Sequence, residues 1–123
     1  MTIEKMRVLV CDDSIFVRKK MVDTLKKAGV AEVYEAPDGG EAVEAYKREL
    51  PDVTFMDIVM PVKSGVEALK EILHINPAAK VVIASSVGTQ GNLKEAIEAG
   101  AYDFLQKPIA DDQLLKILTN LTK

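Results

Sequence analysis

The sequence predicts a doubly wound α/β domain built on a five-stranded parallel sheet. Short segments rich in β-forming residues recur about every 25 residues, and helix-length amphipathic segments lie between them. Two strand-like segments, "VLVC" at 8–11 and "VVIA" at 81–84, are continuously apolar, as expected for strands covered on both faces. Strict alternation of strands and helices indicates a parallel sheet with helices on both sides.

The first half of the chain contains two strand and helix pairs. We expect one strand at 6–11 and another at 32–36. Ser14 and Asp38 are suitable N-caps for the helices that follow, and Gly29 lies where a C-terminal glycine belongs. At 100° per residue, the apolar face of the first helix consists of Ile15, Val17, Met21, Val22, Leu25 and Ala28.

The second half of the chain continues the alternation. Strands are expected at 52–56, 80–85 and 103–106, and the first of the intervening helices ends at the stop signal "NP". Gly100 ends the next helix, and Asp111 is expected to cap the last one. The last helix is expected to pack against the core through Leu114, Ile117, Leu118 and Leu121.

Composition is that of one ordinary globular domain, which we expect to occupy residues 1–123. With 16 basic and 19 acidic residues, the formal charge of -3 gives no indication of a nucleic-acid surface. No apolar run approaches the length of a membrane span. Because Cys11 is the single cysteine, an internal disulfide is excluded, and we expect a reducing, cytoplasmic compartment. We expect the Cys11 side chain to be buried as a small apolar residue.

Polar side chains follow four of the five predicted strands. Asp12 and Asp13 come after the first strand, Asp57 after the third, Ser85 at the end of the fourth and Lys107 after the fifth. The second strand ends without an obvious functional group. In doubly wound sheets, functional groups gather beyond the carboxyl ends of the strands. If the strand order is 2-1-3-4-5, these side chains converge on one crevice.

Three neighbouring carboxylates raise one another's pKa unless a cation neutralises them. A site that offers only oxygen ligands, is acidic and is partly open suits Mg²⁺, which accepts one or two carboxylates and keeps several waters. Mg²⁺ in turn is typical of phosphate chemistry.

Four segments, "VCDDS", "FMDIVMP", "IASS" and "LQKP", occur in this order along the chain. With them the chain closely resembles the receiver domains of two-component response regulators, in particular the stand-alone CheY type. The resemblance covers essentially the whole sequence. It implies the flavodoxin-like receiver fold, five strand and helix pairs with strand order 2-1-3-4-5.

The resemblance implies a phosphoryl site and a Mg²⁺ site. Asp57 would be the phosphoacceptor, a nucleophile that takes a phosphoryl group from a kinase histidine. Asp13, Asp57 and the backbone carbonyl of Val59 would ligate Mg²⁺ directly. Asp12 would act mainly through bound water.

The resemblance also implies a conformational switch. Lys107 would pair with the phosphoryl oxygens, and Ser85 would turn to hydrogen-bond them. Ser86 makes the choice of hydroxyl ambiguous, and its spacing from the strand end favours Ser85. Phe104 would be the aromatic residue whose rotamer follows Ser85. The peptide bond from Lys107 to Pro108 is often cis in this family.

The implied function is a phosphorylation-controlled signalling switch that is not itself an enzyme, with a chemotaxis regulator as the commonest version. Its partners would be a sensor histidine kinase or phosphotransfer protein, and a downstream protein bound by the fourth helix, fifth strand and fifth helix. A phosphorelay intermediate and a receiver domain of a longer regulator are alternatives within the family. A Mg²⁺-dependent phosphohydrolase with an aspartate nucleophile is a different class, but "CDDS" lacks the Asp-x-Asp pattern of haloacid dehalogenases.

A few residues at the rim of the expected site need separate interpretation. Phe16 falls opposite the apolar face of the first helix, so it is either an ordinary exposed aromatic or an anchor for the phosphodonor. Ile109 replaces the phenylalanine often found after Lys-Pro, which is expected to alter the output face. Val59 and Val87 occupy positions that influence hydrolysis in the family, and since neither can orient water we expect a long-lived phosphoryl group.

Overall fold

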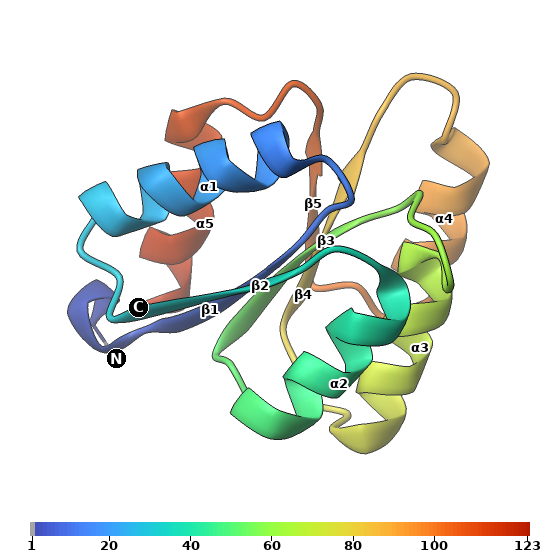
Figure 1. Ribbon diagram of the computed structural model, residues 1–123, viewed down its shortest axis with the longest axis horizontal. Coiled ribbons are helices and arrows are strands. Elements are labelled where there is room, and N and C mark those ends of the chain that lie inside the picture. The colour runs from blue at the N-terminus through green and yellow to red at the C-terminus, as the bar shows by residue number, and fades with distance from the viewer. Residues whose placement is uncertain (1) are drawn as a thin grey trace.

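The strands form one parallel sheet in the order β2-β1-β3-β4-β5 (Figure 1). The structure is a computed structural model that describes residues 2–123. The order and the parallel pairing confirm the predicted fold. Within residues 2–123 the strands are β1 (Arg7–Cys11), β2 (Glu32–Ala36), β3 (Val53–Asp57), β4 (Val81–Ser85) and β5 (Asp103–Gln106).

Helices cover both faces of this sheet (Figure 1). Two helices lie on one face and three on the other, among the residues that the structure describes. The first face carries α1 (Ile15–Lys27) and α5 (Asp111–Leu121), and the second carries α2 (Gly39–Glu49), α3 (Gly65–Ile75) and α4 (Gln90–Ala99). A short 3-10 helix, η1 (Ile3–Lys5), precedes β1. No helix within 2–123 is both long and apolar enough to cross a membrane.

Alternate residues of β1 explain the two-sided core. Val8 and Val10 pack with residues of α1 and α5, whereas Leu9 and Cys11 pack with residues of α2 and α3. Residues 8–11 of this strand are therefore all apolar and buried, because a parallel sheet between two helix layers leaves neither face in water. Cys11 is buried as predicted.

Strand register brings the carboxyl ends of four strands to one edge of the sheet. Cys11 pairs with Met56, Asp57 with Ala84, and Ser85 with Gln106. The residues that follow these positions lie at the upper end of the molecule in Figure 1, where the chain leaves β1, β3, β4 and β5. This edge is the one at which a doubly wound sheet places its functional groups.

Helix starts agree with most of the predicted caps. The side chains of Ser14 and Asp38 accept hydrogen bonds from the backbone N–H of Val17 and Glu41. The prediction for Asp111 is wrong: Ala110 is the N-cap, and Asp111 is the first residue of α5. A carboxylate suits either position, because it interacts favourably with the helix N-terminus throughout the first turn.

The apolar face predicted for α1 is wrong at one residue. Met21, Val22 and Leu25 are buried, but Ile15 is 63% exposed. Ile15 is the first residue of the helix, and the rest of the protein leaves most of its side chain uncovered. Helical periodicity gives the direction of a side chain but not the extent of the surface that it faces.

Candidate functional site

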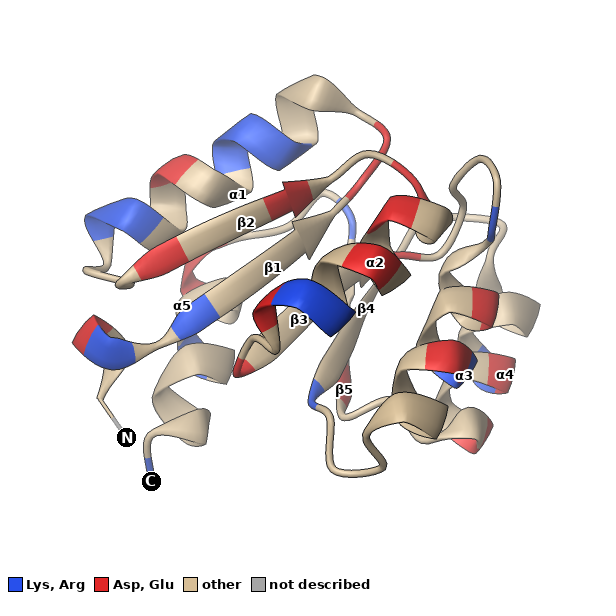
Figure 2. Cartoon of the chain, turned by 60° about the horizontal axis from the view of Figure 1, so that its bottom comes forward, with Lys and Arg blue, Asp and Glu red and all other residues tan. Residues whose placement is uncertain are grey.

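Asp12, Asp13 and Asp57 come together at the carboxyl edge of the sheet. Each offers one carboxylate oxygen, and these three oxygens lie within 4.8 Å of one another. Asp12 and Asp57 are buried, whereas Asp13 is exposed. Figure 2 shows acidic residues where the chain leaves β1 and turns toward α1. The convergence predicted for these three carboxylates is therefore found.

Lys107 reaches the carboxylates from the end of β5, at the same edge of the sheet. Its Nζ donates to Asp12 Oδ2 at 2.9 Å and lies 3.2 Å from Asp57 Oδ1. Its backbone N–H donates to the carbonyl of Ser85 at 2.7 Å, which fixes the chain as it leaves β5. The bond from Lys107 to Pro108 is cis, as predicted. One ammonium thus spans the two buried carboxylates.

Electrostatics at the cluster are governed by burial and by neighbouring charge. Burial raises the pKa of Asp57, the charge of Asp12 raises it further, and the nearby ammonium of Lys107 lowers it without cancelling the increase. Burial lowers the pKa of Lys107, but its hydrogen bond with Asp12 and the charge of Asp57 outweigh that effect and hold the pKa above its usual value. Lys107 therefore stays protonated. The ionised form of Asp57 is disfavoured, and a further cation nearby would stabilise it.

Backbone contacts hold Asp12 and Asp57 in place. The backbone N–H of Ser14 donates to Asp12 Oδ1 at 2.8 Å, so the first turn of α1 orients this carboxylate. A Cβ atom built on Gly65 would lie 2.1 Å from the backbone carbonyl oxygen of Asp57. Only glycine permits this approach of α3 to the end of β3, because any larger residue would displace the segment that carries Asp57.

Arg18 is a positioning residue that the sequence analysis missed. Its Nη1 donates to the backbone carbonyl of Asp12 at 2.7 Å, and its Nε donates to Glu35 Oε1 at 2.9 Å. Glu35 of β2 therefore holds Arg18 against the turn that follows β1. The sequence contains both members of this pair, a basic residue four positions after the N-cap Ser14 and an acidic residue near the end of β2. Only the folded structure shows that they contact each other.

The two predicted switch residues lie on neighbouring strands. Ser85 is buried at the end of β4, and Phe104 is 47% exposed on β5, where it pairs in register with Ile83. Ser86 is exposed, and its backbone N–H and carbonyl are hydrogen-bonded to the Thr89 hydroxyl. Ser85 is thus the buried serine of the pair and Ser86 the exposed one, and the choice of Ser85 as the switch hydroxyl stays a prediction.

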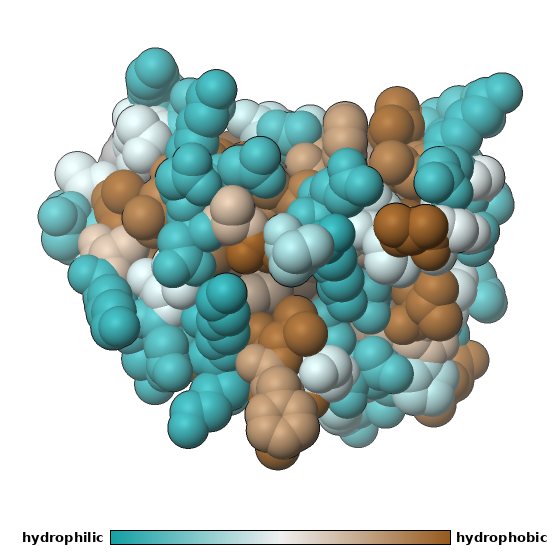
Figure 3. Space-filling view, turned by 90° about the horizontal axis from the view of Figure 1, so that it is seen from above, coloured by the Kyte–Doolittle hydropathy of each residue, from teal (hydrophilic) through white to brown (hydrophobic). Residues whose placement is uncertain are grey.

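Exposed apolar side chains surround the acidic cluster. Phe16 is 83% exposed, and Val59 and Val87, in the loops after β3 and β4, are also exposed. Figure 3 looks down on this end of the molecule and shows apolar side chains scattered among hydrophilic ones. The prediction that Phe16 points into solvent is confirmed. Neither valine carries a group that could hold a water molecule.

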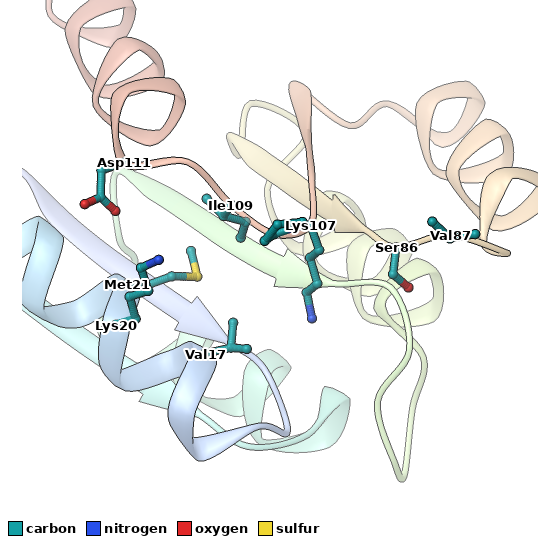
Figure 4. A pocket seen from close by; sticks show the side chains of 9 residues that line it. Val17, Lys20, Met21, Ser86, Val87, Lys107, Ile109 and Asp111 are labelled. Atoms are coloured by element: carbon teal, nitrogen blue, oxygen red, sulfur yellow. The ribbon is translucent and has the colours of Figure 1, made fainter.

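Ile109 follows the cis bond between Lys107 and Pro108. It is half-buried in the segment between β5 and α5, and its side chain faces a pocket that Val17 and Met21 of α1 also line (Figure 4). The effect of Ile109 on the face formed by α4, β5 and α5 stays a prediction.

The acidic cluster has the chemistry of a magnesium site. It offers carboxylate oxygens alone, one of them exposed, so a hard divalent cation could bind and keep part of its water shell. The raised pKa of Asp57 also favours a cation at this place, because burial and the charge of Asp12 outweigh the effect of the Lys107 ammonium. Asp13 and Asp57 are the members best placed to receive a cation, since Asp12 is already occupied by Ser14 and Lys107.

Known proteins resemble this chain over nearly its full length. It is 44% identical over 117 residues to the chemotaxis protein CheY of Thermotoga maritima, which covers 95% of this chain and 98% of that protein. It is 43% identical to CheY of Bacillus subtilis, covering 91% of this chain and 93% of the relative.

Solved structures agree with the sequence relatives. A crystal structure of the CheX-CheY complex with BeF3 and Mg²⁺ from Borrelia burgdorferi contains a chain that is 29% identical and superimposes with a TM-score of 0.88. The match covers 96% of this chain and 90% of that chain. The response regulator receiver domain family matches residues 8–119. With this match over most of its length, and with relatives of the CheY type, the chain belongs to the response regulator receiver domain family.

Proposed function

We propose that residues 1–123 act as one receiver domain that accepts a phosphoryl group on Asp57 in a Mg²⁺-dependent reaction and then binds a protein partner. The observation that carries this proposal is the placement of Asp57. It lies at the end of a central strand, between the ammonium of Lys107 and two further carboxylates. A carboxylate so placed can act as a nucleophile toward phosphorus while its surroundings neutralise the phosphoryl oxygens.

In the proposed reaction, an oxygen of Asp57 attacks the phosphorus atom of a phosphohistidine. A P–O bond to Asp57 forms as the P–N bond to the donor breaks, and the imidazole nitrogen leaves with the bonding electrons. Lys107 is 3.2 Å from Asp57 Oδ1 and can pair with an oxygen of the incoming group. When bound, Mg²⁺ supplies positive charge that stabilises the phosphoryl oxygens. Asp13, Asp57 and the carbonyl of Val59 would hold it, and Asp12 would hold its water.

The proposed switch runs from Ser85 to the face formed by α4, β5 and α5. Phosphorylation adds about one to two negative charges and strong acceptor oxygens beside Ser85 and Lys107. Ser85 then moves toward the phosphoryl group, and Phe104 follows into the space that it leaves. The partial exposure of Phe104 supports this role, since a side chain that is not locked in the core can change rotamer. Converting a mostly inactive population to a mostly active one takes several kcal/mol, roughly 5.5 for a complete reversal.

The proposed setting is chemotaxis signalling in the cytoplasm, supported by relatives that carry that name. The upstream partner would be a sensor histidine kinase or a phosphotransfer protein, and the downstream partner a protein bound by α4, β5 and α5. Direct binding of nucleic acid and catalytic turnover of a substrate are not part of the proposal. The exposed valines Val59 and Val87 favour slow loss of the phosphoryl group.

Acetyl phosphate with Mg²⁺ tests the central claim. We expect the wild-type protein to gain the mass of one phosphoryl group, and the Asp57→Asn variant and an EDTA-treated sample to gain none. Failure of the wild type to be modified would sink the proposal. Sustained release of phosphate from an unrelated phosphate ester would instead support the phosphohydrolase alternative, and transfer onward to a second histidine would support a phosphorelay intermediate.

Phe16 is the proposed anchor for the protein phosphodonor. It is 83% exposed and is the second residue of α1, within one turn of the acidic cluster, so an apolar side chain of the donor could cover it. We expect Phe16→Ala to slow phosphotransfer from the cognate donor by about tenfold, the usual scale for losing an aromatic contact at an interface. Modification by acetyl phosphate serves as the control and should not change. Equal transfer rates for the variant and the wild type would exclude the anchor.

A further inference from the structure

The three carboxylates of the acidic cluster are not held equally. Asp12 is hydrogen-bonded to the backbone of Ser14 and to Lys107, and Asp57 forms an ion pair with the same ammonium. Asp13 is exposed, and its side chain makes no hydrogen bond or ion pair among the residues that the structure describes. The place of Asp13 in the cluster is therefore set by the backbone that carries it.

The peptide group between Asp12 and Asp13 determines where the Asp13 side chain begins. Because a peptide group is planar, the direction of its carbonyl also fixes the direction of the chain into the next residue. This carbonyl accepts a hydrogen bond from Arg18 Nη1 at 2.7 Å, and no backbone N–H within residues 2–123 donates to it. Asp12 is buried, so loss of Arg18 would leave the carbonyl without a protein donor. The peptide would then turn to find another partner.

Arg18 is itself held in place by the end of β2. Its Nε donates to Glu35 Oε1 at 2.9 Å, and its side chain is only 15% exposed. The neighbouring carbonyl of Ala36 accepts the backbone N–H of Asp12 at 3.1 Å. Figure 2 shows acidic residues both at the end of β2 and in the turn after β1. The end of β2 thus fixes Asp12 on both sides, directly at its N–H and through Arg18 at its carbonyl.

We propose that Arg18, held by Glu35, sets the affinity of the acidic cluster for Mg²⁺ by fixing the peptide that carries Asp13. The inference rests on the proposed function, since it concerns the cation that the proposed reaction uses. Arg18 forms no ion pair with the three carboxylates within residues 2–123, so it acts through the backbone as a positioning residue. Loss of a partner that orients a metal ligand typically weakens metal binding by about 10–100-fold.

The charge of Arg18 predicts the opposite effect. A guanidinium beside the cluster repels a divalent cation, so removing it would strengthen Mg²⁺ binding if charge were its whole contribution. Loss of orientation at Asp13 would weaken Mg²⁺ binding instead. The direction of the change in affinity therefore distinguishes a positioning role from a purely electrostatic one.

Mg²⁺ titrations of the wild type and of Arg18→Met test the role without any reaction taking place. The backbone amide NMR signals of Asp13 and Asp57 report binding. We expect the dissociation constant for Mg²⁺ to rise about tenfold in Arg18→Met. Arg18→Lys keeps the charge but lacks the planar fork that contacts two acceptors at once, so its dissociation constant should lie between the other two.

Arg48→Met is the matched control. Arg48 is an exposed residue of α2 that pairs with Glu49, and the variant removes the same charge by the same substitution. We expect its dissociation constant for Mg²⁺ to change by less than about twofold, because salt screens exposed charges that lie far apart. Circular dichroism melts check that every variant is folded at the temperature of the titration.

Glu35→Gln tests whether Glu35 acts through Arg18. We expect this substitution to weaken Mg²⁺ binding in the wild type and to have little further effect in Arg18→Met, because the two residues form one chain of contacts. Equal effects in the two backgrounds would mean that Glu35 acts on the cluster independently, which would overturn its part in the proposal.

Phosphorylation rates separate metal binding from the chemical step. Initial rates of Asp57 modification by acetyl phosphate are measured over a range of Mg²⁺ concentrations. For Arg18→Met we expect the half-saturating Mg²⁺ concentration to rise about tenfold. The rate at saturating Mg²⁺ should stay close to that of the wild type, because Asp57 and Lys107 are unchanged.

The outcomes distinguish this inference from the proposed function. If the wild type binds Mg²⁺ but acetyl phosphate does not modify it, the proposed reaction fails, and the titrations alone decide the role of Arg18. If Arg18→Met binds Mg²⁺ as tightly as the wild type or more tightly, the positioning role is excluded, whatever the melting temperature of the variant. A wild type that binds no Mg²⁺ would overturn both.

Discussion

Asp57 experiences opposing forces within a few ångströms. Burial and the charge of Asp12 favour its protonated form, whereas Lys107 favours the carboxylate. The net result is a raised pKa, so the folded protein binds a proton at Asp57 more tightly than the unfolded chain does. The ionised nucleophile that the proposed reaction requires is therefore formed at a cost in stability.

This cost predicts a stabilised variant. The stability that comes from protonated Asp57 is fully present below the unfolded pKa of 3.8 and is lost as the pH rises through the folded pKa. At neutral pH in EDTA we therefore expect Asp57→Asn to raise the free energy of unfolding by about 1 kcal/mol, an ordinary single-substitution effect. Urea denaturation should show the gain shrinking as the pH is lowered toward 4.

The control for this prediction is Asp23→Asn, which removes an exposed carboxylate of α1 far from the cluster. It should leave the free energy of unfolding almost unchanged at both pH values. A stability of Asp57→Asn equal to or below that of the wild type at neutral pH would contradict the prediction.

Sequence was sufficient to predict the carboxylates and Lys107, because each follows a strand whose apolar run is easily recognised. It was insufficient for Arg18, which acts through a pair of contacts that depend on how α1 crosses β2. Residues that follow strands are placed by the topology alone. The contacts of residues on a helix depend also on the angle at which the helix packs on its neighbours, and no local sequence pattern specifies that angle.

The start of α3 packs closely against the end of β3. Gly65, the first residue of α3, donates its backbone N–H to the carbonyl of Ile58 at 2.7 Å and lies against the carbonyl of Asp57. The start of α3 is closed by a capping box between Ser64 and Glu67. The end of β3 and the start of α3 therefore form one packed unit around Asp57.

This packing predicts a contrast between two glycines. Gly65→Ala places a methyl group where the Asp57 carbonyl lies, so we expect it to lower the free energy of unfolding by more than about 2 kcal/mol and to slow phosphorylation. Gly91→Ala is the matched control in α4, where an added Cβ meets no atom within 4 Å. It should stabilise the protein by about 0.5–1 kcal/mol, because alanine is the better helix former.

Chemical denaturation and phosphorylation rates with acetyl phosphate check both variants. Similar unfolding free energies for Gly65→Ala and the wild type would contradict the prediction. They would mean that the backbone at the end of β3 can shift to accommodate the added methyl group.

Element boundaries were predicted well because strands, glycines and caps are local features. The two errors arose from effects beyond the element. Asp111 was predicted as a cap because the N-cap and first-turn positions favour the same side chains. Ile15 was predicted as buried because the pattern of α1 gives the direction of a side chain but does not reveal how far the core extends along the helix.

At the scale of the whole molecule, the carboxyl edge of the sheet brings three carboxylates together with one ammonium. Three carboxylates face one ammonium, so a bound divalent cation should stabilise the entire fold. At a Mg²⁺ concentration of roughly 100 times its dissociation constant, we expect a gain of about 2.7 kcal/mol in the free energy of unfolding. Thermal melts with Mg²⁺ and with EDTA measure the difference.

Asp13→Asn should reduce this Mg²⁺-dependent gain, and Asp23→Asn should preserve it. Asp13 is exposed, so its variant is expected to fold normally in EDTA. A melting temperature of the wild type that does not respond to Mg²⁺ would exclude the metal site.

The ion pair between Asp12 and Lys107 also has a consequence for synthesis. Ninety-five positions separate the two residues, and the last strand of the sheet carries the second. During translation, all three aspartates are synthesised before Lys107, whose ammonium offsets part of their charge. The chemistry of the site therefore becomes complete only when β5 has joined β4. A truncated product that stops before Lys107 has the acids without their ammonium, so its site is incomplete.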